Sequence, residues 1–328
     1  MDFINRIKKK IGGKSQYDIQ SLLKDVNSIS STHSKMVICP DNTDANWLGV
    51  KNATLAMFPT NSFVIPQSFS NQVLSDSDLQ SLLTTFKNKQ GKSIILSGFP
   101  NYFFKIITIC NKLEIDVEVV FHGGLAELNQ NKSRQDQMSN LFKSGKEGKI
   151  SKFYVVKEGL EVVVEKITGT TTERITPKLD FPKNLNINKF KDGKIHIGIF
   201  GNNSYNKNRH NQVAAAAMVP NSVIHIIGEN EFTYILPNDR VISHKQLNRK
   251  NFLELLGSMD INLYCSYSES WGQVVLESLE LNTPCISSNS SGIIKTVESK
   301  YKKLFIDQVD NPLVIYNAIV ENLKSIKL

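Results

Sequence analysis

The sequence contains no apolar run long enough to cross a membrane. A spanning helix needs about 20 consecutive apolar residues, whereas the hydrophobic residues here, 40% of the 328, are spread over short runs. The first residues also lack the apolar core and the small-residue cleavage site of a signal peptide. We therefore expect a soluble chain, or one that is held at most against a membrane surface.

Cysteine is scarce, and its pattern excludes the common cysteine frameworks. The four cysteines, Cys39, Cys110, Cys265 and Cys285, are widely spaced and form no Cys-x-x-Cys or Cys/His group. Three of them lie in apolar runs, where a small buried thiol is the ordinary expectation. The sequence predicts neither disulfides nor structural zinc, and it favours a reducing, cytoplasmic compartment.

Several signatures of nucleotide and metal enzymes are missing as well. No Gly-x-Gly-x-x-Gly follows a strand and no Gly-x4-Gly-Lys-Ser/Thr is present, which argues against nicotinamide, flavin and P-loop enzymes. No metalloprotease, nucleophile-elbow or EF-hand motif occurs. The acidic "DSD" at 76–78 follows Ser75, so helix capping explains it better than metal binding. We expect neither a metal nor a cofactor.

Positive charge is in excess, with a formal net charge of +8, and part of it lies in the opening "MDFINRIKKKIGGK". Apolar residues recur there at helical spacing beside basic ones. Such a stretch is able to lie on an anionic membrane surface, and it is equally compatible with a solvated terminus. The sequence leaves both interpretations open, so the predicted location is cytoplasmic with optional attachment to the inner face of the membrane.

Short apolar runs alternate with segments of helical period, which is typical of α/β layers with parallel strands. The pattern lapses over 168–192, a Thr-, Pro-, Asn- and Lys-rich segment that we interpret as the inter-domain connection. We predict two Rossmann-like domains, at 1–185 and 186–310, and a terminal helix at 311–328 able to pack back toward the N-terminal domain. Strands are expected at 35–40, 93–98, 117–123, 152–156, 195–200, 223–228, 240–243, 260–266 and 284–288, and helices at about 76–89, 101–113, 133–144, 158–166, 208–218, 249–257, 272–281 and 311–325.

The segment 260–288 carries the strongest chemical signal. A buried strand ends in "YSES", the chain turns at Trp271 and Gly272, and a helix follows. The first N–H groups of such a helix are unpaired and form an anion site, which Gly272 lets a phosphate approach. Glu277 lies one turn further on the same face as Gln273. A carboxylate among apolar neighbours needs donors, such as the two hydroxyls of a ribose; the alternative is a partly exposed glutamate paired with a surface lysine.

The same segment, "SESWGQVVLESLELNTPCISSNSSGI", resembles the donor-binding domain of GT-B glycosyltransferases, specifically the large retaining family with a Glu-x7-Glu motif. The resemblance extends upstream through "FLELLGSMDINLYCSYSES", "VIHIIGEN" and "IHIGIFGNNSYNKNRHNQVAAAA", and so covers about residues 195–298. It implies a GT-B fold, α/β with two Rossmann-like domains facing across a cleft. The N-terminal half is similar to the family only in general layout.

The resemblance assigns roles to individual residues. Glu277 matches the glutamate that holds the nucleotide ribose, and Glu269 matches the one at the donor sugar. The amides of Gly272, Gln273 and Val274 fall where the family binds the distal phosphate, with Ser270 beside them in the same turn.

The family also places a lysine and an arginine at the donor diphosphate. Lys207 aligns with the lysine, but the arginine position just after Gly201 is Asn202 here. Arg209, two residues beyond Lys207, is a candidate replacement because guanidinium groups bind phosphate bidentately. The alternative for Lys207 and Arg209 is a solvated basic loop.

Histidines offer further candidates. His122 ends a strand in "VVFHGG", where the family often has a histidine near the acceptor or donor sugar, so it is a second catalytic candidate beside Glu269; it is otherwise a structural histidine. His225, inside "VIHIIG", is predicted to be a core or sheet histidine. If the family layout holds, Glu229, Ser243 and His244 lie on the nucleobase side.

The resemblance thus implies a hexosyltransferase-type enzyme (EC 2.4) that moves a sugar from a nucleoside-diphosphate sugar to an acceptor hydroxyl of a glycan or lipid-linked acceptor, without metal and with retention. The basic N-terminus suits bacterial capsule, lipopolysaccharide or glycolipid synthesis, and no nucleic acid partner is expected. One alternative is a catalytically silent GT-B subunit that binds glycan or supports a partner transferase. It is suggested by Asn202, which stands where the family has an arginine. Another is a GT-B epimerase, which needs a fuller acid/base set than the sequence offers.

Overall fold

The computed structural model describes residues 17–41, 48–66, 74–129 and 132–326. The chain divides into two compact units, Met1–Val120 with Glu147–Lys152, and Phe121–Lys146 with Phe153–Leu328. The basic stretch at 1–14 lies outside the described residues, so the structure does not test its predicted membrane contact. Within the part of the chain that is described, no helix is both long and apolar enough to span a bilayer.

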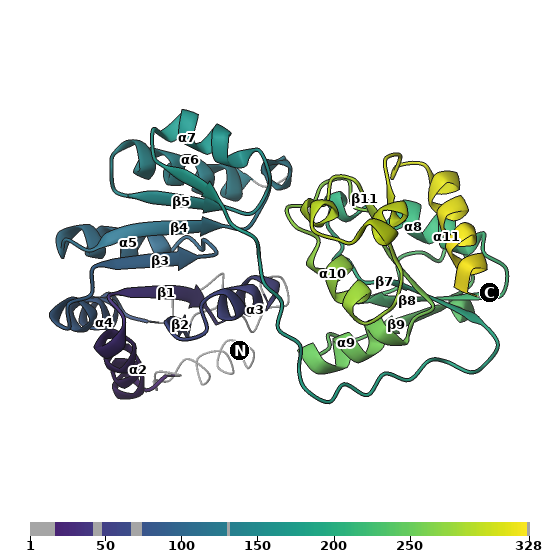
Figure 1. Cartoon of the computed structure of the whole chain (residues 1–328), viewed down its shortest axis with the longest axis horizontal. Coiled ribbons are helices and arrows are strands. Elements are labelled where there is room, and N and C mark those ends of the chain that lie inside the picture. The colour runs from purple at the N-terminus through teal and green to yellow at the C-terminus, as the bar shows by residue number, and fades with distance from the viewer. Residues whose placement is uncertain (1–16, 42–47, 67–73, 130–131, 327–328) are drawn as a thin grey trace, which may run out of the picture. The chain divides into compact units, whose positions relative to one another are not determined.

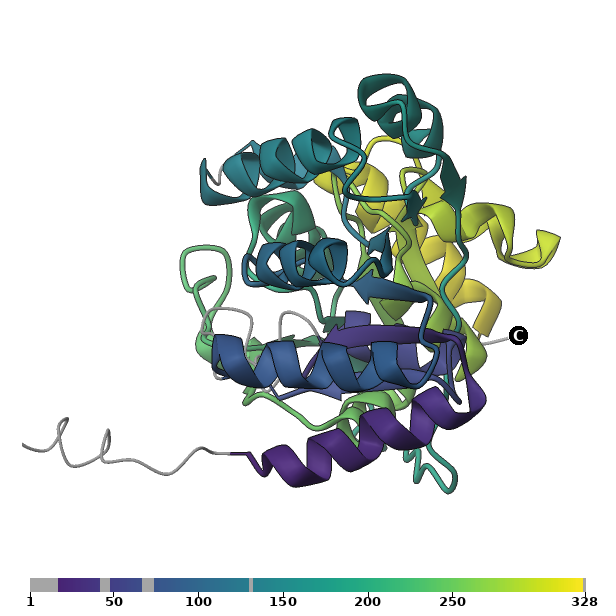
Figure 2. The same cartoon turned by 90° about the vertical axis from the view of Figure 1, so that its left-hand side faces the viewer.

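The first sheet has six strands in the order β2-β1-β3-β4-β5-β6, and every pairing with a recorded register is parallel. Its central strand β3 is buried throughout, as expected for a parallel sheet covered on both faces. Helices α2 and α4 lie side by side (Figure 2). The elements are α2 (Ile19–Thr32), β1 (Lys35–Pro40), α3 (Leu48–Met57), β2 (Ser62–Ile65), α4 (Asp76–Asn88), β3 (Ser93–Ser97), α5 (Phe103–Lys112), β4 (Asp116–Phe121), η2 (Leu125–Leu128), α6 (Lys132–Lys146), β5 (Lys152–Val155), α7 (Leu160–Thr168) and β6 (Thr172–Arg174).

The second sheet also has six parallel strands, in the order β12-β11-β10-β7-β8-β9. Figure 1 labels β7, β8, β9 and β11 of this sheet. Because β7 is followed in space by β8 on one side and β10 on the other, the strand order reverses at β7. The elements are β7 (Ile195–Ile199), η3 (Tyr205–Lys207), α8 (Arg209–Ala217), β8 (Ser222–Ile227), η4 (Asn238–Arg240), β9 (Val241–His244), α9 (Arg249–Ser258), β10 (Ile261–Tyr264), α10 (Gln273–Glu280), β11 (Cys285–Ser288), η5 (Gly292–Lys295), η6 (Ser299–Leu304), β12 (Phe305–Ile306) and α11 (Pro312–Ile326).

Four helices cover the second sheet in two pairs. Helix α8 packs beside α11, and α9 packs beside α10. Since crossovers between parallel strands are right-handed, α8 (from β7 to β8) and α10 (from β10 to β11) lie on opposite faces of the sheet. The apolar side of α11 (Ile315, Ala318 and Ile319) belongs to the core of this sheet.

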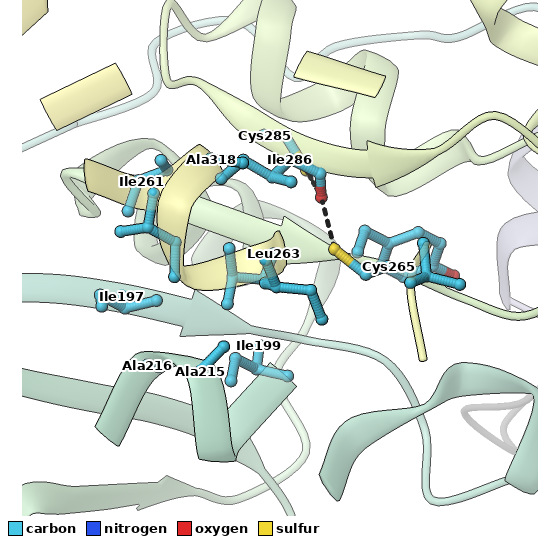
Figure 3. Packing of buried hydrophobic residues seen from close by; sticks show 14 of the residues in the cluster. Ile197, Ile199, Ala215, Ala216, Ile261, Leu263, Cys265, Cys285, Ile286 and Ala318 are labelled. Atoms are coloured by element: carbon cyan, nitrogen blue, oxygen red, sulfur yellow. Dashed lines mark hydrogen bonds between the residues drawn. The ribbon is translucent and has the colours of Figure 1, made fainter. Parts of the chain in front are cut away.

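The core of the second sheet is built from the Val/Ile/Leu-rich strands and the alanine-rich helix α8. Ile197, Ile199, Ile261 and Leu263 are at most 1% exposed, and they pack with Ala215, Ala216, Cys285, Ile286 and Ala318 (Figure 3). The thiol of Cys265 lies 3.5 Å from the carbonyl oxygen of Ile286. All four cysteines are buried free thiols, so the prediction that they form no disulfide is confirmed.

The predicted α/β class with two Rossmann-like sheets is confirmed, and Ser75 caps α4 through a hydrogen bond of 3.1 Å from the Asp78 amide. The segment 168–192 was predicted to be an irregular connection, but its first part forms β6, which pairs in parallel with β5. The reason is that a short edge strand needs no apolar alternation: β6 is "TER", with only Thr172 buried. Helices α2 and α3 and strands β2 and β12 were not predicted.

Candidate functional site

The carboxyl end of the second sheet collects most of the predicted site residues. Gly201 and Lys207 follow β7, Glu229 follows β8, His244 ends β9, and Glu269 follows β10. The loops after β7 and β10 leave the sheet toward opposite faces, and ligands of open α/β sheets bind in the crevice that such a reversal creates. Lys207 and Glu269 come from these two loops, and the structure brings them into contact.

Lys207 and Glu269 form a buried ion pair. The Lys207 ammonium contacts Glu269 Oε1 and donates a hydrogen bond of 3.0 Å to the Tyr264 hydroxyl, and the Lys207 and Glu269 side chains are 15% and 7% exposed. Burial disfavours the charged lysine, but the Glu269 carboxylate and the Tyr264 oxygen outweigh it, so the pKa of Lys207 is raised. A permanent cation is therefore fixed between the β7 and β10 loops, where it can neutralise a phosphate.

Close packing of the loop after β7 holds Lys207 in this position. A side chain at Gly201 would lie 3.3 Å from Lys207 Cβ, so glycine gives the lysine its room. Asn202 is exposed and folds the loop locally, accepting a 3.2 Å hydrogen bond from the Ser204 amide. Asn202 thus supplies a turn at the point where the resemblance expects an arginine, and it adds no charge.

Arg209 lies at the start of α8 and is buried, with 4% of its surface exposed. Its guanidinium is 3.6 Å from Glu231 and lies over the Phe232 ring at 5.1 Å. Two of its nitrogens, Nε and Nη2, have no hydrogen-bond partner among the residues that the structure describes. Arg209 is therefore not part of a solvated basic loop. Its positive charge is already largely neutralised by Glu231, so it is a weak replacement for the arginine that is missing at position 202.

The N-terminus of α10 is open. Gly272 precedes the helix at φ +91°, a left-handed conformation that favours glycine, and a Cβ there would clash with Ser291 Oγ. No side chain caps the helix, so its first amides, those of Gln273 and Val274, are donors without a capping partner. Ser270, half-buried, lies in the turn before it. Four and five residues along the chain from Glu269, these amides offer a second anion-binding element.

Glu277 is 1% exposed and pairs with Arg249, whose Nη1 lies 2.5 Å from Glu277 Oε1. The alternative of a partly exposed glutamate beside a surface lysine is therefore wrong. Burial raises the pKa of Glu277, and Arg249 and Gln273 oppose that rise. A carboxylate accepts about four hydrogen bonds, so lone pairs remain for a ligand. Within the described part of the chain, Arg249 Nη2 is buried without a hydrogen-bond partner.

The remaining candidate residues form neither of these two ion pairs. Glu229 and Ser243 are exposed, while His244 is half-buried at the end of β9. His122 follows β4 and is partly buried, and burial lowers the pKa of its imidazole to about 4, so this histidine is neutral at physiological pH. His225 is 1% exposed within β8, which confirms that it is a core histidine.

Sequence reasoning missed two partners that complete the site. Arg249 begins α9, and nothing in its local sequence indicates that it reaches Glu277 on the neighbouring helix. Tyr264 is the last residue of β10, where the apolar pattern predicted only a buried ring. One signal was available for Arg249: a buried carboxylate demands a donor, and the helix next to α10 starts with a basic residue.

Comparison with known proteins supports a transferase domain at this site. Residues 180–325 match the model of the family "Glycosyl transferases group 1". Among the curated proteins, none matches the sequence. The fold is similar to Anabaena Alr3699/HepE in complex with UDP and glucose (TM-score 0.66, 14% identity, 89% of this chain and 92% of that one).

Two further solved structures have the same fold. Sucrose-phosphate synthase from Thermosynechococcus elongatus superposes with a TM-score of 0.62 at 14% identity, over 88% of this chain and 89% of that one. S. aureus TarM gives a TM-score of 0.56 at 15% identity, over 75% of this chain and 52% of that one. The matched segment 180–325 contains the second sheet with both ion pairs, and these structures share the two-domain architecture. The chain thus has a GT-B fold, and its segment 180–325 matches the family of group 1 glycosyl transferases.

Proposed function

We propose that the chain transfers a sugar from a nucleoside-diphosphate sugar to the hydroxyl of a glycan or lipid-linked acceptor, with retention and without a metal ion. The observation that carries the proposal is the ammonium of Lys207, fixed by Glu269 and Tyr264 beside the loop that leads to the uncapped N-terminus of α10. Solved proteins of this fold are in complex with UDP and glucose, or with UDP and alpha-GlcNAc-glycerol.

Departure of the nucleoside diphosphate builds negative charge on the leaving oxygens. Preorganised donors that face such charge typically supply 100- to 1,000-fold each in rate. Lys207 supplies a full charge, and the amides of Gln273 and Val274 supply helix-terminus donors. Together they provide the neutralisation that a divalent cation provides in other transferases.

Each of the two glutamates has a distinct task in this proposal. Glu277, oriented by Arg249, accepts hydrogen bonds from the ribose hydroxyls. Glu269 holds Lys207 in place and also faces the donor sugar. His122, neutral at physiological pH, orients the acceptor or donor sugar by hydrogen bonding.

A donor panel tests the proposal. Purified protein is incubated with UDP-, GDP-, TDP- and ADP-sugars, with and without EDTA, and release of nucleoside diphosphate is measured. We expect one donor to be turned over equally in both conditions. If no donor is hydrolysed or transferred, and none raises the melting temperature, the transferase proposal fails. Loss of turnover in EDTA would refute only metal independence.

A silent GT-B subunit is the second candidate, and one observation favours it. Asn202 adds no charge, and Arg209 is already engaged by Glu231, so the basic set at the diphosphate is smaller than in the family pattern. A silent subunit would bind a nucleotide or glycan, yet turn over no donor in the panel. Transfer activity from the isolated chain excludes this candidate.

We further propose that the acceptor is presented at a membrane, in bacterial surface polysaccharide or glycolipid synthesis, through residues 1–14. The support is the sequence alone, whose basic and apolar residues alternate at helical spacing. Deletion of residues 1–14 is expected to abolish cosedimentation with vesicles that contain anionic lipid. Replacement of Lys8, Lys9 and Lys10 by glutamine should weaken it, and unchanged binding by both variants contradicts the proposal.

A further inference from the structure

Three histidines from neighbouring strands form one continuous hydrogen-bonded chain in the second sheet. His196 Nδ1 lies 2.8 Å from His225 Nε2, and His225 Nδ1 lies 2.9 Å from His244 Nε2. At the far end, His196 Nε2 lies 2.9 Å from Asp192 Oδ1. We call Asp192, His196, His225 and His244 the histidine relay.

The relay runs diagonally across the sheet. His196 is the second residue of β7, His225 pairs across with Gly198 on β7 and Ile242 on β9, and His244 is the last residue of β9. The chain thus starts at the amino end of β7 and finishes at the carboxyl end of β9. That is the edge at which Lys207 and Glu269 lie and at which the nucleotide is proposed to bind.

The middle of the relay is shielded from water. His196 and His225 are 2% and 1% exposed, and the Phe190 ring stacks on His196 with centroids 3.9 Å apart. Asp192, at the entrance, keeps 47% of its side chain exposed. The hydrogen bond from His196 lowers the pKa of Asp192, so this carboxylate is ionised and only accepts hydrogen bonds.

An ionised acceptor at one end dictates the proton positions along the whole relay. Burial lowers the pKa of His225 to about 3, so this imidazole is neutral and carries one N–H. Because Asp192 accepts, His196 in its neutral form donates from Nε2 and accepts at Nδ1. His225 must then donate from Nε2 and accept at Nδ1, and His244 likewise donates from Nε2. The remaining nitrogen, Nδ1 of His244, is left as an acceptor.

Nδ1 of His244 has no hydrogen-bond partner among the residues that the structure describes. The carbonyl oxygen of His244 accepts a 2.9 Å hydrogen bond from the Gly228 amide, which joins the loops after β8 and β9 next to Glu229. His244 therefore ends the relay at the point where the two loops assigned to the nucleobase meet, with an acceptor nitrogen still to be used.

We propose that the histidine relay fixes the tautomer of His244 and that its acceptor Nδ1 selects a donor nucleotide whose base carries a ring N–H, as uracil, thymine and guanine do. This inference rests on the proposed function, since it needs a nucleotide at the carboxyl edge. Cytosine and adenine present an unprotonated ring nitrogen at the corresponding edge, so two lone pairs would face each other. A buried hydrogen bond that is lost in this way costs about 10- to 100-fold in affinity.

Calorimetric titration with UDP and CDP tests the selection, because these two differ only at the pyrimidine edge. The wild type is expected to bind UDP at least about tenfold more tightly than CDP. His225→Phe keeps a ring in the core but interrupts the relay, so His244 is free to change tautomer and the UDP/CDP ratio should fall below threefold. His210→Phe, on an exposed histidine that bonds Tyr234 outside the relay, is the matched control and should keep the wild-type ratio.

Asp192→Ala provides a second variant, at a residue that keeps 47% of its side chain exposed. It removes the oxygen that accepts from His196 Nε2, so no ionised acceptor dictates the direction of the relay; the Lys194 amide loses the same acceptor. We expect the UDP/CDP ratio to fall in this variant too. An unchanged ratio in both relay variants overturns the inference, as does a wild type that binds UDP and CDP equally.

The tautomer itself is measured without any nucleotide. Histidine ¹H–¹⁵N correlation spectra of the free protein at neutral pH should show His244 protonated at Nε2 and unprotonated at Nδ1. A proton on Nδ1 overturns the relay whatever the protein binds. If no nucleoside diphosphate binds at all, the proposed function and the base selection both fail, while the spectra still decide whether the relay has the assigned direction.

Discussion

The second sheet holds two different kinds of buried polar interaction. At its carboxyl edge, Lys207–Glu269 and Arg249–Glu277 keep full charges in contact, whereas in its interior the histidine relay keeps His225 neutral between two other imidazoles. Isolated buried charges cost several kcal/mol, and a neutral hydrogen-bonded chain avoids that cost. This difference indicates where a ligand is expected. The two ion pairs lie at the carboxyl edge, where the phosphates and ribose hydroxyls of a nucleotide can replace or extend the contacts between the charged side chains.

Breaking the first ion pair should have the largest effect. Lys207→Ala removes the cation from the diphosphate site and leaves Glu269 buried without it, so kcat should fall by about 100- to 1,000-fold. The measurement is initial-rate kinetics with the donor found in the panel. Lys295→Ala is the control, because Lys295 is a 61% exposed lysine that pairs with Glu158 at the surface. A Lys207 variant with wild-type kcat contradicts the assignment.

Breaking the second ion pair should weaken nucleotide binding more than chemistry. Glu277→Gln keeps the shape of the side chain but loses the charge that Arg249 and the ribose share, so Kd for the nucleoside diphosphate should rise by about 10- to 100-fold. Titration calorimetry measures it. Glu254→Gln, at a glutamate that pairs with Lys250 at 3.8 Å, should leave Kd unchanged. Equal affinities for both variants would remove Glu277 from the site.

A substitution at Gly272 tests whether the backbone turn before α10 is as tight as described. Gly272→Ala forces a side chain into φ +91° and against Ser291, so the free energy of unfolding should fall by about 1–2 kcal/mol from the backbone alone. Chemical denaturation measures it. Gly124→Ala is the control, since a Cβ at Gly124 meets nothing within 4 Å. Should both variants be equally stable, the tight turn before α10 is not constrained as described.

The neutral relay predicts a pH dependence that the ion pairs do not share. The pKa of His225 is about 3 in the folded chain against an ordinary value of 6.5, so the unfolded chain binds the extra proton as pH falls below 6.5. Stability is then lost toward acid, by up to about 1.4 kcal/mol per pH unit. Denaturation between pH 7 and pH 4 should show a shallower slope for His225→Phe than for the wild type or His210→Phe, and identical slopes would contradict the neutral relay.

Much of the fold was predictable because its strands are short apolar runs between segments of helical period. The polar edge strand β6, in which only Thr172 is buried, was not predicted because its pattern is weak. The two-glutamate spacing located α10 and the loop before it. It could not reveal Arg249 or Tyr264, because their roles depend on tertiary contacts between elements that are far apart in sequence.

The histidines show the same limit more sharply. His225 was predictable as a core residue from its place in an apolar strand, and it is buried. That it lies between His196 and His244 follows from the register of three strands, which no local pattern encodes. Arg209 is a related case: its basic character suggested a phosphate ligand, whereas its burial against Glu231 and Phe232 depends on the loop after β8.

The central claim is that Lys207 and the open end of α10 form a binding site for a nucleoside diphosphate. Calorimetric titration of UDP, TDP, GDP, ADP and CDP into the wild type and Lys207→Ala, in the presence of EDTA, tests it most directly. The account predicts that at least one diphosphate binds the wild type and that Lys207→Ala weakens this binding at least tenfold. Binding of none of them, or equal binding by both proteins, would contradict it.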